Sequence, residues 1–567
     1  MIEMAWHDPD RPAGRWTLRM PAWTPGSYMI RDPARHVVGL TAHRAGVPLT
    51  AAWTGKDRWE VDHPQSGPLT VTYRVFAHDL SVRESFLDDE FGLLLGTSLF
   101  LRMEGEDGPQ RVTIHHPPAW QLLTALSPEP GTDASFVAPD YDALVDAPIY
   151  VGPARVDSFV AGGADHRIVL VGSGNENLDR IRSDLDAVVR AAHDLFGPPP
   201  YACYTFFLVL SDRRGGGLEH RDSTCIIYPR FGFEPRTEYR KFLVLCAHEF
   251  FHTWNVKRIR PVELGPFDYQ SEVYTDLLWA MEGLTSYYAE LLCLRAGCFG
   301  PAVFLERLAE AIRDLDATPG RLMMSLAAAS RLAWIKHYRP DASAPSTQVS
   351  YYLKGMLVGL CLDLFIRART AGARSLDHVM RGLWEHQQST GAGVTYARWV
   401  HLAEHATGLN LAEVLETWVR QPGELPFESL LAPFGLRLVR AASPPGKADS
   451  DPDGGGYLGA RIQVQDGRLR VEHVLADSPA EAAGVAPGDE LVALGGVRLD
   501  PATWESRIAA LPPRTRTDLA LFRRDALLVR TVTLGEAPPA SYRIIPAEDT
   551  EDSRLLREGL LGPGALA

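Results

Sequence analysis

The chain has 567 residues, a length that predicts about three or four domains. Hydrophobic residues make up 46% and charged residues 23%, as in globular proteins that bury a sizeable core. Asp and Glu (71) outnumber Lys and Arg (57), so the net charge is −14. An acidic surface repels phosphate groups, which argues against nucleic acids and anionic membranes as partners.

The first 155 residues have the pattern of an antiparallel β domain. Apolar and polar residues alternate in short runs at 15–23, 69–80 and 110–116. Clusters of Gly, Pro and Asp separate these runs and predict turns. We therefore expect an N-terminal β domain over residues 1–155.

A second region, residues 156–440, changes from mixed to helical. Strands are predicted at 166–174 and 204–212, on either side of an amphipathic helix at 177–197. Three long helices follow: 237–255 with Thr237 as candidate N-cap, 271–297 with Gly297 as C-cap, and 348–369.

The C-terminal part begins with a linker at 441–456, which is rich in Gly, Pro and Asp. Short predicted strands then extend to about residue 540. The last residues, 541–567, are polar and then rich in Gly and Leu, and we expect an appended tail.

The cellular location is predicted from what the sequence lacks. No run of 18 apolar residues predicts a membrane span, and the start MIEMAWHDPD has no signal-peptide pattern. The six cysteines show no CxxC spacing and lie mostly in apolar runs, so we expect buried free thiols. We predict a cytoplasmic location, or a periplasmic one if an upstream leader is missing.

The stretch CAHEFFHTWNVKRIRP (246–261) is the main functional signal. Residues four apart stack on one face of a helix, so His248 and His252 can direct both imidazoles at one ion. Zinc accepts such ligands, and a catalytic zinc site combines three protein ligands with water. Glu249 would flank that water, as the HExxH mechanism requires. Buried ionisable groups are costly unless they pair or coordinate, which favours a metal over ordinary helix side chains.

A third ligand must come from the next predicted helix. Glu282, 30 residues after His252, leads because its neighbours one turn away are apolar. Glu272 and Asp276 lie near the helix start, where a carboxylate gains from the helix dipole and can simply cap. Glu290 is a lesser candidate on a face that we expect to be solvated.

The motifs together resemble a known family. HEFFHTWNVKRIRP followed by MEGLTSYY resembles the glycyl aminopeptidases, a gluzincin group of zinc metallopeptidases. Further matches, which take the resemblance to about residue 540, are PAWTPGSYMIRD (21–32), LSVRESFLDDEFG (80–92), GGGLEHRDS (215–223) and YYLKG (351–355). The resemblance implies a thermolysin-like catalytic domain, one zinc ion, and Glu282 as its third ligand.

The resemblance also implies catalytic roles. Zinc lowers the pKa of its bound water, and Glu249 then takes the proton and passes it to the leaving amine. The segment YLKG resembles that of related aminopeptidases in which the tyrosine donates to the oxyanion, which assigns this role to Tyr352, with Tyr351 as runner-up. The alternative is that both tyrosines only pack their helix.

An aminopeptidase must pair with the free α-ammonium of its substrate. Glu219 can present such a carboxylate, and the glycines before it, Gly216 and Gly217 among them, let backbone approach a peptide closely. The segment GGGLEH resembles the Gly-x-Met-Glu-Asn exopeptidase segment of other gluzincins, with Leu218 and His220 as departures. The alternative is a Gly-rich turn with a solvated glutamate.

Substrate preference follows from the family name: small N-terminal residues, Gly and Ala. Phe251 and Trp279 are bulky residues consistent with a small pocket, although the sequence does not show that they fill it.

The basic residues Lys257, Arg258 and Arg260 follow the HExxH motif. They could bind the substrate, but salt bridges that hold a loop are the favoured interpretation.

Two stretches, GYLGARIQVQDGRLRVEHV (456–474) and SPAEAAGVAPGDELVALGGVRL (478–499), resemble a PDZ domain, which we expect over residues 457–540. In such a domain the loop Tyr457, Leu458, Gly459 and Ala460 would bind a C-terminal carboxylate, and the strand at 461–464 would pair with the peptide. The alternative is a domain that only packs against the catalytic unit.

Three functions therefore compete. The leading one is a zinc aminopeptidase that hydrolyses the N-terminal peptide bond of peptides. If Glu219 is only structural, the enzyme is a zinc endopeptidase. A peptide-binding scaffold that acts through the PDZ domain is the third, and the intact HEFFH motif and Glu282 argue against it.

Overall fold

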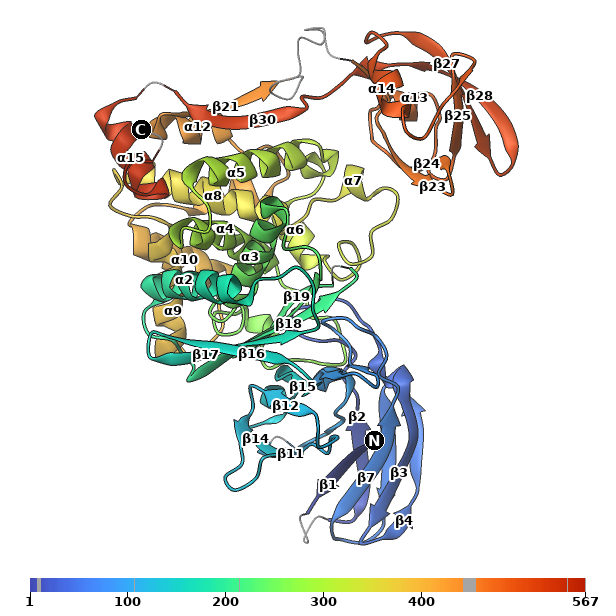
Figure 1. Ribbon diagram of the computed structural model, residues 1–567, viewed down its shortest axis with the longest axis vertical. Helices are drawn as coiled ribbons and strands as arrows, with labels where there is room; N and C mark the ends of the chain where they lie inside the picture. Colours follow the sequence, from blue (N-terminus) through green and yellow to red (C-terminus); the bar gives the residue numbers. More distant parts are fainter. Residues whose placement is uncertain (8–11, 107, 214, 442–454, 548, 566–567) are drawn as a thin grey trace. The chain divides into compact units, whose positions relative to one another are not determined.

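The computed structural model describes residues 1–7, 12–106, 108–213, 215–441, 455–547 and 549–565. They form two compact units that alternate along the sequence: residues 1–275, 288–299 and 380–399, and residues 276–287, 300–379 and 400–567. The predicted multidomain α+β architecture is confirmed (Figure 1).

The N-terminal β domain contains two four-stranded sheets built from antiparallel pairs. Alternation explains the core: Leu69, Val71 and Tyr73 of one strand are all buried, while the residues between them are more exposed. In sheet order the strands are β1 (Ile2–Trp6), β7 (Leu69–Val75), β3 (Val37–Arg44) and β4 (Val47–Leu49), then β10 (Arg102–Met103), β2 (Gly14–Arg19), β6 (Arg58–His63) and β5 (Ala51–Gly55).

Two further sheets, one of three strands and one of four, and a short helix, α1 (Tyr141–Asp146), complete this domain. Asp140 caps α1 by accepting from the Ala143 backbone N–H. The strands in sheet order are β11 (Gln110–Thr113), β14 (Ser135–Ala138) and β13 (Ser127–Pro128), then β12 (Gln121–Thr124), β15 (Ile149–Gly152), β9 (Gly92–Leu94) and β8 (Phe86–Leu87).

A five-stranded mixed sheet follows. Its three central strands are parallel, and the two edge strands are antiparallel to their neighbours. The amphipathic helix α2 (Leu178–Phe196) is the crossover between two parallel strands, and the Asn177 side chain caps it as N-cap. The strands in sheet order are β16 (Arg155–Ala161), β17 (Ala164–Val171), β18 (Cys203–Ser211), β20 (Ser223–Pro229) and β19 (Gly216–Glu219).

Helix α3 (Arg236–Phe251) comes directly after this sheet. The prediction of Thr237 as N-cap is wrong: Pro235 is the N-cap and Thr237 lies inside the first turn. Proline suits a helix start because its missing N–H would lack an intrahelical partner there.

Long helices with many buried residues follow α3 in the sequence. The predicted helix 271–297 begins later, with one π-helical turn at Trp279–Gly283 that leads into α4 (Leu284–Arg295). The predicted helix 348–369 also begins later, as α8 (Leu353–Arg369). A Cβ atom on Gly283 would lie 2.4 Å from the Gly355 Cα atom, so glycine lets the π turn and α8 touch backbone to backbone. The other helices are α5 (Pro301–Asp316), α6 (Leu326–Arg331), α7 (Ala344–Thr347), α9 (Leu376–Thr390), α10 (Tyr396–Thr407), α11 (Ala412–Leu415) and α12 (Phe427–Leu431).

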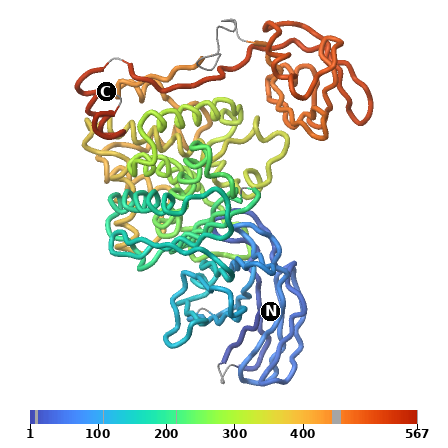
Figure 2. Tube along the Cα trace, viewed as in Figure 1, coloured from blue at the N-terminus to red at the C-terminus, as the bar shows by residue number. Residues whose placement is uncertain are grey.

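The end of the chain is structured. Residues expected to form a tail contain β30 (Ser541–Pro546), which pairs antiparallel with β21 (Leu436–Ala441), and α15 (Glu551–Leu561). Figure 2 shows the red end of the trace running beside the β21 segment. In the predicted linker 441–456, residues 442–454 lie outside the described residues.

The PDZ module lies between these two paired strands in the sequence. In its main sheet β23 is one edge strand and β28 the other. Its elements are β22 (Gly456–Tyr457), β23 (Ala460–Gln465), β24 (Arg468–Val474), α13 (Pro479–Ala482), β25 (Glu490–Leu494), β26 (Val497–Arg498), α14 (Trp504–Ala509), β27 (Arg516–Arg523), β28 (Ala526–Thr533) and β29 (Gly535–Glu536). Throughout the described part of the chain, helices that combine the length and the apolarity of a bilayer span are absent.

Candidate metal centre and active site

The two histidines of the HExxH motif lie at the exit of α3. His248 is in its last turn, and His252 is the C-cap residue, still with right-handed helical backbone angles. Their rings meet edge to face, and the two Nε2 atoms are 3.0 Å apart. Zinc ligands about 2.0–2.1 Å from a tetrahedral ion would be about 3.3 Å apart, so the pair fits such an ion closely.

A backbone carbonyl fixes the proton position on His252. The Nδ1 atom lies 2.7 Å from the Asn255 carbonyl oxygen, which can only accept. The proton therefore sits on Nδ1 in the neutral ring, and the Nε2 lone pair points at His248. Outer hydrogen bonds of this kind orient histidine ligands in metal sites.

Glu282 is the residue from the next helix that joins the pair. Ligand atoms of His248, His252 and Glu282 all lie within 4.8 Å of one another. Glu282 is buried in the π-helical turn, and such turns are frequent at functional sites.

The other acidic candidates are placed differently. Asp276 forms ion pairs with Arg331 and Arg420, and Glu272 is exposed. Glu290 is buried, so the expectation of a solvated face was wrong: α4 is enclosed on that side as well.

Two carboxylates face each other beside His252. Oxygen atoms of Glu219 and Glu249 lie within 4.8 Å of one another and of a His252 ring nitrogen, and all three residues are buried. A Cβ atom on Gly217 would lie 2.2 Å from Glu249 Oε1, so glycine is needed where β19 passes this carboxylate. Buried carboxylates gathered in this way are suited to pair with a cation.

A pocket adjoins Glu219. Its walls include Trp23, Gly26 and Tyr28 of the N-terminal β domain, with Phe267 and Val256 from the chain after α3. The sequence did not predict these walls. Phe251 and Trp279, the residues that it suggested, are not among the described residues that line this pocket: both are fully buried, and Phe251 stacks on Tyr288.

The candidate oxyanion donors lie just before α8, outside the helix in which they were predicted. Tyr351 is fully buried, whereas Tyr352 is half-buried at the N-cap. Burial raises the pKa of the Tyr352 hydroxyl well above its usual value, and the negative charge of Glu282 raises it further. The hydroxyl therefore stays protonated and can donate.

His337 is a neighbour that the sequence analysis missed. Its ring lies 4.9 Å from the Tyr351 ring and 5.5 Å from the Tyr352 ring, centroid to centroid. Burial lowers the pKa of His337, while the Glu282 charge acts in the opposite direction. It lies in an irregular segment without periodicity, so no sequence pattern could have located it.

The basic cluster after α3 holds the structure together, as favoured from the sequence. Lys257 Nζ donates to Asp146 Oδ1 at 2.7 Å. Arg258 is buried and donates to Asp222 Oδ1 at 2.7 Å and to three backbone carbonyls. These bonds anchor the loop that leaves the HExxH helix.

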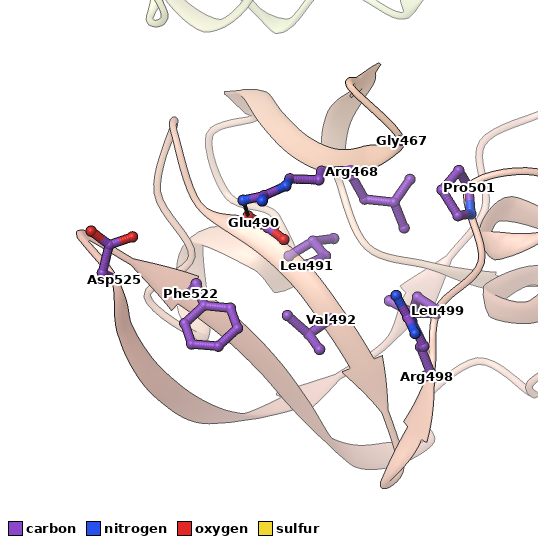
Figure 3. Close-up of a pocket in the computed structure, with 11 residues that line it drawn as sticks. Gly467, Arg468, Glu490, Leu491, Val492, Arg498, Leu499, Pro501, Phe522 and Asp525 are labelled. Carbon is purple, nitrogen blue, oxygen red and sulfur yellow. Dashed lines mark hydrogen bonds and ion pairs between the residues drawn. The ribbon is translucent and has the colours of Figure 1, made fainter.

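The predicted carboxylate loop of the PDZ module is Tyr457–Ala460, at the start of edge strand β23. Gly459 has a positive φ of +76°, and a Cβ atom there would lie 2.3 Å from Ser478 Cβ. The pocket drawn in Figure 3 lies elsewhere in this module: none of the four loop residues lines it, and the Arg468–Glu490 ion pair lies on its wall.

Comparisons with known proteins identify domains in three parts of the chain. The Peptidase M61 N-terminal domain model matches residues 2–153, the M61 glycyl aminopeptidase model matches 241–358, and a PDZ domain model matches 448–515. The crystal structure of an aminopeptidase N family protein from Idiomarina loihiensis is 30% identical, covers 98% of this chain and 97% of its own, and has a TM-score of 0.90. The chain belongs to the M61 glycyl aminopeptidase family.

Membership in the glycyl aminopeptidase family makes the protein a metallo-aminopeptidase, as the motifs predicted. An M1 zinc metallopeptidase from Deinococcus radiodurans is also similar, with 17% identity, a TM-score of 0.46, and coverage of 75% of this chain and 90% of that chain. A comparison with curated proteins gave no match.

Proposed function

We propose that this metallo-aminopeptidase uses one zinc ion to remove N-terminal residues from peptides, and that it prefers Gly and Ala. The observation that carries the proposal is the convergence of His248, His252 and Glu282 within 4.8 Å, with the Glu219 and Glu249 carboxylates beside them. Two imidazoles and one carboxylate are a typical ligand set of catalytic zinc.

The chain's own residues supply the remaining steps. A bound zinc ion would supply Lewis-acid activation of water and of the peptide carbonyl. Glu249 takes the proton of the attacking water and delivers it to the leaving amine. Tyr352 donates a hydrogen bond to the oxygen that becomes negative, and Glu219 pairs with the substrate's α-ammonium group.

The preference for small residues is supported by the pocket at Glu219. Trp23, Tyr28 and Phe267 are large and rigid, and Trp23 packs edge to face on Phe267 at 6.1 Å. A side chain next to the bound ammonium would meet these rings, so glycine and alanine fit best.

Anilide substrates test the proposal. Glycyl and alanyl anilides should be cleaved with higher kcat/KM than leucyl or phenylalanyl anilides, and N-acetylated quenched peptides should resist. The metal should be identified by elemental analysis of the purified protein. Cleavage of the blocked peptides alone would identify an endopeptidase, and a metal-free, inactive protein would favour the scaffold.

The PDZ module has a second proposed ligand, a peptide C-terminus. Edge strand β23 has a neighbour on one side only among the described strands, and edge strands recruit extended peptides by backbone pairing. The test uses full-length Glu249→Gln protein, so that the probe is not hydrolysed. A peptide with a free C-terminal carboxylate should bind more tightly than its amide, and equal binding would reject recognition of the C-terminus.

A reducing compartment, the cytoplasm, suits this chain. All six cysteines are free thiols in the structure, and disulfides are uncommon in reducing compartments.

A further inference from the structure

The turn Thr24–Ser27 of the N-terminal β domain touches the amine-recognition site. Its sequence is Thr-Pro-Gly-Ser, and the Ser27 backbone N–H donates to the Thr24 carbonyl oxygen at 3.1 Å. Gly26 has a φ of +93°, the positive value that a type II turn demands at its third residue, after proline. The turn is therefore a local structure that the sequence specifies by itself.

Three contacts hold this turn against the segment that follows α3. The Ala22 backbone N–H donates to the Tyr269 carbonyl oxygen at 2.7 Å, and the Trp23 indole N–H donates to the Asp268 carbonyl oxygen at 2.8 Å. The Trp23 ring also packs on Phe267. Since both Ala22 and Trp23 are buried, the tip of the turn has a fixed position.

The tip of the turn meets the Glu219 carboxylate. A Cβ atom on Gly26 would lie 2.6 Å from each Glu219 carboxylate oxygen and 2.7 Å from Leu218 Cδ1. Atoms at that separation clash, so only glycine leaves room for the carboxylate as it stands. Glu219 is 3% exposed, so its carboxylate could move away from a new methyl group only within a buried environment.

We infer that Gly26 is a positioning residue for recognition of the substrate's amino group. The turn 24–27 contacts the Glu219 carboxylate and fixes its position. This inference rests on the proposed role of Glu219. It gives the N-terminal β domain a part in exopeptidase specificity, because one of its turns fixes where an ammonium group can pair.

The main test is Gly26→Ala, with Gly46→Ala as its matched control. Gly46 lies in the same domain with a similar φ of +83°, but a Cβ atom there meets nothing within 4 Å. Both variants place alanine at a positive φ of similar size, and only Gly26→Ala is expected to displace Glu219. The inhibition constants of alaninamide and of propionamide, which lacks only the amine, report on ammonium binding.

We expect Gly26→Ala to raise the inhibition constant of alaninamide by about tenfold, which corresponds to the loss of one charge-assisted hydrogen bond. The inhibition constant of propionamide and the metal content should not change. KM for alanyl anilide should rise by a similar factor while kcat stays within about threefold. Gly46→Ala should leave the ratio of the two inhibition constants at the wild-type value. Equal ratios in the two variants would overturn the inference.

A compensating variant covers the case in which Gly26→Ala unfolds. Glu219→Asp shortens the carboxylate and makes room for the new methyl group. The double variant should then recover the inhibitor ratio of Glu219→Asp alone, and its melting temperature should lie below that of Glu219→Asp only by about the loss that Gly46→Ala causes in the wild type. A double variant as unstable as Gly26→Ala would show that the clash lies elsewhere and would overturn the inference.

Glu219→Ala separates this inference from the proposed function. If Glu219→Ala raises the inhibition constants of alaninamide and propionamide by the same factor, Glu219 does not bind the amine and its proposed role is rejected. If Glu219→Ala raises the constant of alaninamide selectively but Gly26→Ala does not, only the role of the turn is rejected.

Discussion

The Nε2 atoms of His248 and His252 lie 3.0 Å apart, on rings that meet at nearly a right angle. Two ring nitrogens this close share either a proton or a cation. A shared cation would bind the Nε2 lone pairs of both rings. Because the proton of the neutral His252 ring is on Nδ1, the lone pair on its Nε2 atom is available for that cation.

Loss of one imidazole should remove the metal. We expect His252→Ala protein to purify with little bound metal and without peptidase activity. The chain offers a matched control, His405→Ala. His401 and His405 have the same spacing of four on α10, but both are exposed. Elemental analysis and turnover of alanyl anilide check both variants, and a fully metal-loaded His252→Ala protein would contradict the proposed ligand set.

Glu249→Gln should separate metal binding from turnover. The amide keeps the shape of the side chain but cannot take a proton, so kcat should fall by about 10³-fold while the metal stays bound. Glu238→Gln is the control, because Glu238 lies on the same helix and pairs with Lys241 at the surface. Activity of Glu249→Gln near the wild-type level would mean that another group is the base.

Tyr352→Phe and Tyr351→Phe distinguish the two candidate oxyanion donors. Removal of such a donor lowers kcat by about 100-fold or more and leaves KM nearly unchanged. We expect this result for Tyr352, whose hydroxyl is close enough to Glu282 for that charge to raise its pKa. Because Tyr351 is fully buried, the Tyr351→Phe substitution should mainly lower the melting temperature. The opposite pattern would assign the role to Tyr351.

The ion pair of Asp146 and Lys257 should make stability depend on pH. Burial alone would raise the pKa of Asp146, but Lys257 and His220 act more strongly together and hold it well below its usual value. A lowered pKa stabilises the folded state above the unfolded value of about 3.9, and this contribution is lost as the pH falls below about 4.

Asp146→Asn measures this contribution. It leaves the nearly buried Lys257 side chain unpaired and should cost about 3 kcal/mol at pH 7. The difference from wild type in urea unfolding should shrink as the pH falls below 4. Asp62→Asn, which breaks an exposed pair with Arg15, should cost less than about 1 kcal/mol at either pH.

Removal of residues 541–567 should destabilise the second unit. It deletes β30, the partner of β21, and α15, whose Leu560 and Leu561 are buried. The Gly559 carbonyl oxygen also accepts from Arg367 of α8 at 2.8 Å. Burial of two leucines alone contributes about 4 kcal/mol. Thermal unfolding checks this, with a chain that ends at Gly562 as the control expected to melt near wild type.

Local patterns were enough to predict much of the fold. Alternation identified strands such as β7, and helical periodicity identified α2. The HExxH spacing identified His248 and His252, because both lie on one short stretch of chain. These signals depend only on neighbours in sequence.

Features that depend on tertiary contacts could not be predicted. The run 348–369 is largely apolar on both sides of Leu353, so nothing marked Leu353 as the first helical residue of α8. Glu219 has a neighbour in Gly26, nearly 200 residues earlier, and a glycine in a Pro-Gly turn looks the same whether or not a carboxylate lies against it. Pairing of β30 with β21 was hidden for the same reason.

The ladder of β21 and β30 has a consequence for the evolution and handling of the PDZ module. The module is inserted in the sequence between two strands, β21 and β30, that pair with each other. It is therefore attached to the rest of the chain at both of its ends. A single proteolytic cut inside the module would not release it. A stop codon before the module would also remove β30, the strand that pairs with β21. Excising the module cleanly requires a short connection from residue 441 to residue 541, which leaves the ladder whole.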